Sequence, residues 1–209
     1  MRTLAIETAS EACSIALFEG EVLIARDHRV MGRGHAEALV PMIAGLPDKG
    51  RAARIVVSLG PGSFTGVRIG LATARALGFA WNAPVLGYPT LALIAAQARE
   101  HHPGDAVTVC TNGGHGEWFV QDFGNEGLPN GPVASLTPDA AAARPVAQVI
   151  AGNRAAELAA RLEDGRAALD LLPDARAMLL LNPALLTLAL APIYGRGADA
   201  TPMAERARS

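Results

Sequence analysis

The order of strand-like and helix-like segments constrains this chain most, because nearly the same order runs through it twice. Three short alternating segments come first and indicate an antiparallel meander, at residues 2–7, 13–18 and 22–28. Helices are then expected at 35–46, 63–81 (ending near Gly78) and 90–100, with strands between them at 54–60 and 84–90. The second half restarts with strands at 106–111, 116–123 and 146–152, followed by helices at 154–162 and 174–190.

This repetition predicts two α/β lobes of related topology. The boundary is expected at residues 101–105 (HHPGD), which gives an N-terminal lobe at 1–100 and a C-terminal lobe at 101–209. The chain has 209 residues, half of them hydrophobic, and this length is enough to bury a substantial core.

Charge and apolar patterning exclude several classes of protein. Charged residues make up 18% of the chain, the formal net charge is −2, and Lys49 is the only lysine, so the composition gives no electrostatic footprint for nucleic acid. The chain opens on strand-like alternation instead of a signal-peptide apolar block, and we expect the mature chain to begin at Met1. The apolar segment 177–191 is split by Asn182 and Pro183 and falls short of the roughly 20 residues that a membrane span needs. Two buried helices are expected there instead.

Two cysteines, Cys13 and Cys110, stand far apart in apolar runs. Neither has a second cysteine at metal-binding or redox spacing. Buried free thiols in a reducing cytosol are therefore expected.

The stretch LGPGSFTGVRIG opens like a phosphate-binding loop but lacks its chemistry. A Walker loop needs Gly-Lys-Ser/Thr, whereas Gly66 precedes Val67 and no lysine is near. The glycines at 60 and 62 also lack the third glycine of a dinucleotide fingerprint. The favoured interpretation is a strand–turn–helix connection in which Gly60 and Gly62 allow a tight turn and Ser63 or Thr65 caps the helix. An anion at the helix N-terminus is the alternative.

Small residues recur at every fourth position of the following helix, at Gly66, Gly70, Ala74 and Gly78. Each glycine inside a helix costs about 1 kcal/mol relative to alanine, so the repetition requires a packing reason. Either a partner helix approaches this face closely, or the face packs on the protein's own sheet. Spacing alone leaves both open.

Several segments resemble the TsaB (YeaZ) family. They are LAIETASEACSIALFEGEVL, HAEALVPMI, SLGPGSFTGVRIGLATARALG and PVLGYPTLALIA, and the likeness is dense over residues 3–95. It thins afterwards to GHGEWFVQDF and APIYGRGADATP. The resemblance implies a two-lobed ASKHA fold (actin-like ATPase, RNase H-like), here with a C-terminal lobe that is trimmed.

The resemblance also implies a function. Members of the family are non-catalytic dimerisation subunits of the bacterial complex that places a threonylcarbamoyl group on adenosine 37, beside the anticodon of ANN-decoding tRNAs. The implied partners are TsaD as the catalytic subunit, the ATPase TsaE and the threonylcarbamoyl-adenylate synthase. Contact with tRNA would be indirect, the location cytoplasmic, and no membrane would be involved.

The residues agree with a non-catalytic interpretation. In nucleotide-binding ASKHA proteins the first hairpin has an acid followed by a glycine, but here Glu7 is followed by Thr8 and Ala9. In the second lobe, Asn112 stands where the family has an acid and His115 where it has an arginine. No histidine pair has zinc spacing and no Gly-x-Ser-x-Gly elbow occurs, so no catalytic or metal residue is expected.

These observations lead to expectations about ligands and alternatives. No cofactor is expected on this chain alone, and ATP or ADP at the partner interface stays open. Two alternatives are retained, which are an ASKHA-type nucleotide-dependent enzyme acting alone and a plain homodimeric structural protein. A nucleotide-binding titration separates the first alternative from the scaffold hypothesis.

The expected interface is a four-helix contact of helices 35–46 and 64–79 with the equivalent pair of TsaD, or with a second copy when the chain is alone. The resemblance assigns ten residues to it: His35, Leu39, Met42, Ile43, Gly66, Ile69, Gly70, Thr73, Ala74 and Leu77. Gly70→Leu is expected to weaken association and leave the fold mostly intact. Unfolding instead would place this face in the core.

Overall fold

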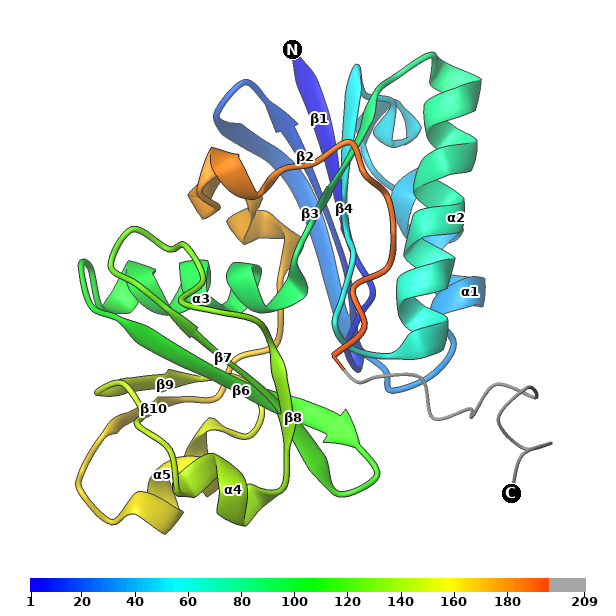
Figure 1. The fold of residues 1–209 in the computed structure, drawn as a ribbon. Helices are drawn as coiled ribbons and strands as arrows, with labels where there is room; N and C mark the ends of the chain where they lie inside the picture. Colours follow the sequence, from blue (N-terminus) through cyan, green and yellow to red (C-terminus); the bar gives the residue numbers. More distant parts are fainter. Residues whose placement is uncertain (196–209) are drawn as a thin grey trace, which may run out of the picture.

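The first lobe of the computed structural model, which describes residues 1–195, is built on a five-stranded sheet in the order β3-β2-β1-β4-β5 (Figure 1). Its strands are β1 Arg2–Glu7, β2 Ala12–Glu19, β3 Val22–Val30, β4 Arg54–Ser58 and β5 Val85–Tyr88. β1 pairs antiparallel with β2 and parallel with β4, so an antiparallel meander continues into a parallel half-sheet. The predicted meander is confirmed.

The second sheet repeats this arrangement, in the order β10-β9-β6-β7-β8. Its strands are β6 Val107–Gly114, β7 Glu117–Phe123, β8 Ala134–Leu136, β9 Val149–Ala151 and β10 Ala167–Leu169. β6 pairs antiparallel with β7 and parallel with β9, as β1 does with β2 and β4. The expected α/β fold with two lobes of related topology is confirmed.

Five layers alternate between helices and sheets (Figure 1). Helices α1 His35–Ala44 and α2 Phe64–Trp81 cover the outer face of the first sheet. Helix α3 Thr90–His101 lies between the two sheets, and its apolar residues share one core with both. Helices α4 Pro138–Ala142 and α5 Ala155–Leu162 cover the far face of the second sheet. Because helices cover both faces of the first sheet, β1 and β2 are buried almost along their whole length.

The C-terminal part of the described chain corrects a predicted helix. Residues 174–190 form two short 3₁₀ helices, η2 Ala175–Leu180 and η3 Pro183–Leu185, followed by extended chain. Pro183 has no N–H to donate, and the Asn182 side chain accepts the Ala184 N–H, so the first helix cannot continue across this pair. Leu179 and Leu180 are exposed, which also corrects the expectation that both helices are buried.

Part of the chain that was expected in the C-terminal lobe packs on the first lobe instead. Residues 186–195, here called the C-terminal strap, run back along the first lobe beside α2 (Figure 1). Thr187 exchanges backbone hydrogen bonds with Gly87 of β5, and the Ile193 N–H donates to Leu59 O at 2.7 Å. The segment assigned to the C-terminal lobe therefore partly belongs to the first, and residues 196–209 of that prediction, including the end of the APIYGRGADATP motif, lie outside the described residues.

Other boundaries differ from the sequence prediction more locally. α1 ends at Ala44, two residues early, and runs through Pro41. α2 continues to Trp81, because Asn82 in the left-handed region supplies the C-cap instead of Gly78. The short elements β8, α4 and β10 were not predicted. Within residues 1–195 no helix combines the length and the apolar character that a membrane crossing requires.

Candidate functional site

The loop at 59–63 lies against the turn between β1 and β2. The Ser63 N–H donates to Ala9 O at 2.7 Å, and a Cβ on Gly62 would lie 2.0 Å from the same oxygen. Gly60 has a φ of +90°, which a side chain would strain. Both glycines thus serve the predicted tight turn. Ser63 is the N-cap, because its Oγ accepts the Gly66 N–H at 3.1 Å, and Thr65 is exposed in the first turn.

Glu7, the acid of the first hairpin, is fully buried. Its carboxyl group accepts the Ala9 N–H at 2.7 Å and the Tyr88 hydroxyl at 3.2 Å. Burial raises the pKa of Glu7 to about 7, and its hydrogen bonds only partly offset this effect. A carboxyl group in this state is a poor partner for a magnesium–nucleotide, which needs a charged and accessible oxygen.

The lobes approach each other around a cleft of about 670 Å³. On one side are the β1–β2 turn and the N-terminus of α2, and on the other is the end of β6 with Asn112. A hydrogen bond crosses between the lobes, from Asn153 Nδ2 to Glu11 Oε1 at 2.8 Å. Asn153 Oδ1 in turn accepts the Asn112 N–H at 2.9 Å. The side-chain oxygen of Asn112 accepts the Gly114 N–H at 3.1 Å, so this amide takes part in the local turn.

The described lining of the cleft offers few groups to the nucleotide that the fold class implies. It contains no lysine or arginine, and His115 is its one basic side chain, so no permanent cation faces a polyphosphate. The Gly62 backbone and Ala9 O already occupy the space against the first hairpin, where the phosphates of a nucleotide would have to approach. Among residues 1–195, no three His, Cys, Asp or Glu side chains form a group that could hold a metal ion.

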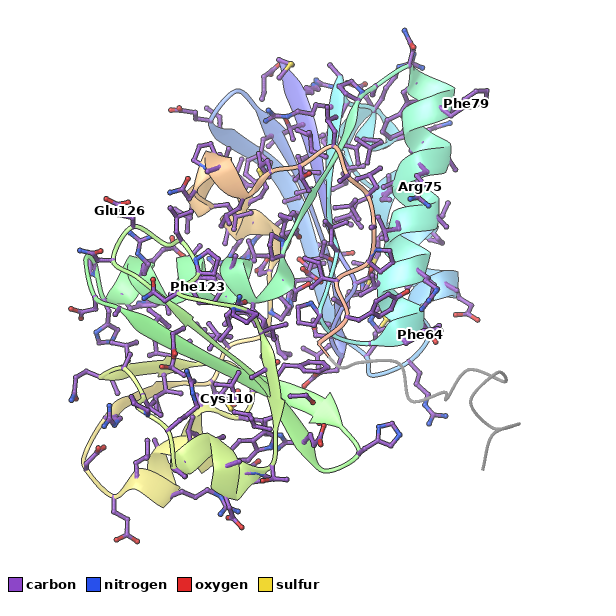
Figure 2. The ribbon with its side chains drawn as sticks, viewed as in Figure 1. Phe64, Arg75, Phe79, Cys110, Phe123 and Glu126 are labelled. Carbon is purple, nitrogen blue, oxygen red and sulfur yellow. The ribbon has the colours of Figure 1, made fainter. Side chains whose placement is uncertain are left out.

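The outer surface of α1 and α2 exposes apolar side chains beside the charged Glu37, Arg68 and Arg75. Val40 of α1 is 56% exposed and Phe79 of α2 is 93% exposed, and Ala72 and Ala76 are exposed between the ends of α2. Figure 2 shows Phe79 projecting from the C-terminal end of α2, away from the rest of the molecule. We call the exposed residues Val40, Ala72, Ala76 and Phe79 the outer face.

The C-terminal strap borders this surface. The Arg75 guanidinium donates to Leu190 O at 2.8 Å, and Arg68 donates to the Tyr194 hydroxyl at 2.8 Å. The Arg68 guanidinium also lies over the Phe64 ring, 3.2 Å from its centre. Both arginines thus hold the strap against α2.

The comparisons with known proteins agree with one another. The family model described as "TsaD: tRNA N6-adenosine threonylcarbamoyltransferase" matches residues 28–129. The tRNA threonylcarbamoyladenosine biosynthesis protein TsaB of Escherichia coli K12 is 34% identical over 128 residues, which are 59% of this chain and 55% of that protein. The protein of the same name from Haemophilus influenzae is 37% identical over 110 residues, 50% of this chain and 46% of that protein.

A solved structure extends the likeness to both lobes. YeaZ from Pseudomonas aeruginosa superposes with a TM-score of 0.76 and 28% identity, covering 92% of this chain and 99% of that one. The chain is therefore similar to the TsaB and YeaZ proteins in sequence over about half its length and in fold over both lobes. Its sequence alignments span about half the length of the curated TsaB relatives, while the structural match includes almost the whole YeaZ chain.

The ten residues expected at the partner interface differ in how accessible they are in this chain. Seven of the ten expected residues are buried inside this chain: His35, Leu39, Met42, Ile43, Gly66, Gly70 and Ala74. A Cβ on Gly66 would lie 2.1 Å from Thr8 O, and one on Gly70 would lie 2.4 Å from Thr8 Oγ1. The small-residue face therefore packs on the protein's own sheet. Only Ile69, Thr73 and Leu77 are partly accessible.

The outer face residues were missed by the sequence prediction. Positions 72, 76 and 79 lie on one side of α2. Helical spacing alone puts this side opposite the face that carries the glycines. Spacing alone did not separate the two faces, because opposite sides of α2 both carry small or apolar residues. Cys13 and Cys110, by contrast, are buried and free as predicted, and burial raises the pKa of the Cys110 thiol to about 12.

Proposed function

We propose that this chain is a non-catalytic subunit in the biosynthesis of threonylcarbamoyladenosine in tRNA, and that it acts in the cytoplasm by binding and activating TsaD. The observation that carries the proposal is the exposed outer face of α1 and α2 in a chain whose fold matches YeaZ. The chemistry of the cleft supports the non-catalytic part, because its described lining supplies no lysine or arginine for phosphate.

The outer face has the properties of a helix-packing surface. Ala72 and Ala76 are small, so a partner helix can approach the α2 backbone closely. Phe79 and Val40 supply large exposed apolar groups, whose burial on association is favourable. A four-helix contact with the equivalent pair of TsaD follows, now through this face instead of the glycine face. Without TsaD, the same surface is expected to pair with a second copy.

Nucleotide and tRNA enter this proposal only through the partners. ATP or ADP at the interface would require lysine or arginine side chains from TsaD, because the cleft of this chain supplies neither within the described residues. TsaE and the threonylcarbamoyl-adenylate synthase act beside the pair, and tRNA is contacted indirectly.

The test places one negative charge in the outer face and the same charge elsewhere. We expect Ala76→Glu to weaken the complex with TsaD by about 2 kcal/mol or more, roughly 30-fold, because the carboxylate would be buried without a partner. Ala160→Glu on α5 is the matched control, since Ala160 is also an exposed helical alanine. Size-exclusion chromatography with light scattering measures the complex of each variant with TsaD from the same organism.

Activity is measured in the same series. TsaD, TsaE, the synthase, ATP and an ANN-decoding tRNA are combined with each variant, and threonylcarbamoyl transfer to the tRNA is quantified. Transfer should require this chain, fall with Ala76→Glu and persist with Ala160→Glu. Equal complex formation by both variants would contradict the outer face, and transfer without this chain would contradict the activating role.

A further inference from the structure

The cleft between the lobes keeps an apolar floor although it has lost the features of a nucleotide site. Side chains from three parts of the chain form this floor: Leu91, Ile94, Phe119, Leu171, Leu172 and Pro173. A concave site of about 670 Å³ with an apolar lining and a few polar groups is typical of small-molecule sites. The proposed TsaD contact uses the opposite side of the first sheet and does not account for it.

A buried hydroxyl in this cleft has no partner. Thr90, the first residue of α3, lines the cleft and is 3% exposed. Its N–H donates to Gly60 O at 2.8 Å, but its Oγ1 makes no hydrogen bond in the structure. Leaving a buried hydroxyl unpaired costs about 1–3 kcal/mol, so a ligand that pairs with it would recover this free energy.

The charges around the cleft select against anions. Its described lining contains no lysine or arginine, its one basic side chain is that of His115, and its one carboxylate, on Glu11, is engaged by Asn153. A phosphate or carboxylate would lose its hydration without gaining a cation. The N-terminus of α2 is partly used, because Ser63 Oγ accepts the Gly66 N–H.

We propose that the interlobe cleft binds an uncharged, largely apolar small molecule with one hydrogen-bonding group, which pairs with Thr90 Oγ1. The site is separate from the proposed partner surface and does not depend on it.

The first experiment is a fluorescence titration of the full chain with Nile red, a neutral dye that carries a carbonyl acceptor. We expect one saturable site, weakened about tenfold by Leu172→Asp, which places a charge on the apolar floor. Leu172 is partly exposed, so the change is compatible with folding, which circular dichroism checks. Phe79→Ser, which removes the most exposed aromatic group of the outer face, should leave the dye affinity unchanged.

A second pair of variants tests the hydroxyl itself. Thr90→Val keeps the shape and removes the hydroxyl, and we expect it to weaken dye binding about fivefold. Thr90→Ser keeps the hydroxyl and should bind like the original chain. If Leu172→Asp does not fold, the two Thr90 variants still test whether the dye binds in the cleft.

Three results would overturn the proposal. They are the absence of saturable dye binding, dye binding that is lost in Phe79→Ser but kept in Leu172→Asp, and binding of magnesium–ATP that Leu172→Asp abolishes. None of these results depends on complex formation with TsaD, so failure here is distinguishable from failure of the proposed function.

Discussion

Glu7 carries a carboxyl group that has no contact with solvent. Removing it from water disfavours the ionised form, and the hydrogen bonds from Ala9 N–H and Tyr88 only partly compensate, so the pKa rises from 4.5 to about 7. In a nucleotide-binding relative of this fold the same position would have to remain charged. Here the side chain is a buried structural acid.

The raised pKa of Glu7 makes stability depend on pH. Between pH 4.5 and about 7 the folded chain holds this proton while the unfolded chain has released it, so the free energy of unfolding falls as pH rises. The loss approaches about 3 kcal/mol. We expect Glu7→Gln, which cannot ionise, to lose correspondingly less stability over this range. Urea unfolding of both proteins between pH 5 and pH 8 measures it, and parallel curves would contradict the assignment.

Helix α2 has two faces that look alike in sequence and differ in the structure. Its glycine face approaches β1 so closely that Thr8 Oγ1 donates to Gly66 O at 2.8 Å. Its other face carries Ala72, Ala76 and Phe79 into solvent. Small residues are therefore required on one face by the sheet behind them, and we expect them to be required on the other by a partner.

Substitution on the glycine face should destabilise the fold instead of weakening association. Gly66→Ala places a Cβ 2.1 Å from Thr8 O, a backbone atom, and we expect a net loss of about 1–3 kcal/mol despite the better helix propensity of alanine. Gly124→Ala is the control, because its nearest neighbour, Asn130 Oδ1, would be at 3.4 Å. Chemical unfolding compares the two. A more stable Gly66→Ala would show that the face is not packed on the sheet.

The two lobes share one core, and a segment that follows the second lobe in the sequence contacts the first sheet. Phe18 of β2, Leu93 of α3 and Val109 of β6 belong to a single buried cluster. Farther along, Asp174 accepts hydrogen bonds from Ser14 Oγ and Arg26, which ties the start of η2 to the first sheet. The lobes are consequently not independent folding units.

Cooperative unfolding is the expected result at the scale of the whole molecule. Each lobe contains one of the chain's two tryptophans, Trp81 in α2 and Trp118 in β7. We expect Trp81→Phe and Trp118→Phe, each of which leaves one reporter, to give fluorescence transitions that coincide with the loss of helical circular dichroism in the same variant. Two separated transitions would show that the shared core does not couple the lobes.

Most long elements were predictable from the sequence, and the failures have two separate causes. The strands β1, β2, β4 and β7 carry apolar or alternating segments with turn residues between them, and their type follows from local pattern. The three-residue strands β8 and β10 carry too little pattern to detect. The helix expected at 174–190 is interrupted because Asn182 and Pro183 favour a turn.

The sequence by itself determined the local features of this protein, including the repeated order of elements, the Gly60–Gly62 turn and the Ser63 cap. Each depends on residues a few positions apart, whose backbone preferences act in any context. Only the tertiary structure decided which face of α2 is covered, where the strap lies and how Glu7 titrates. Those properties depend on contacts between residues far apart in the sequence, such as Thr8 and Gly66, which are 58 residues apart. The periodicity of a single segment carries no information about such contacts.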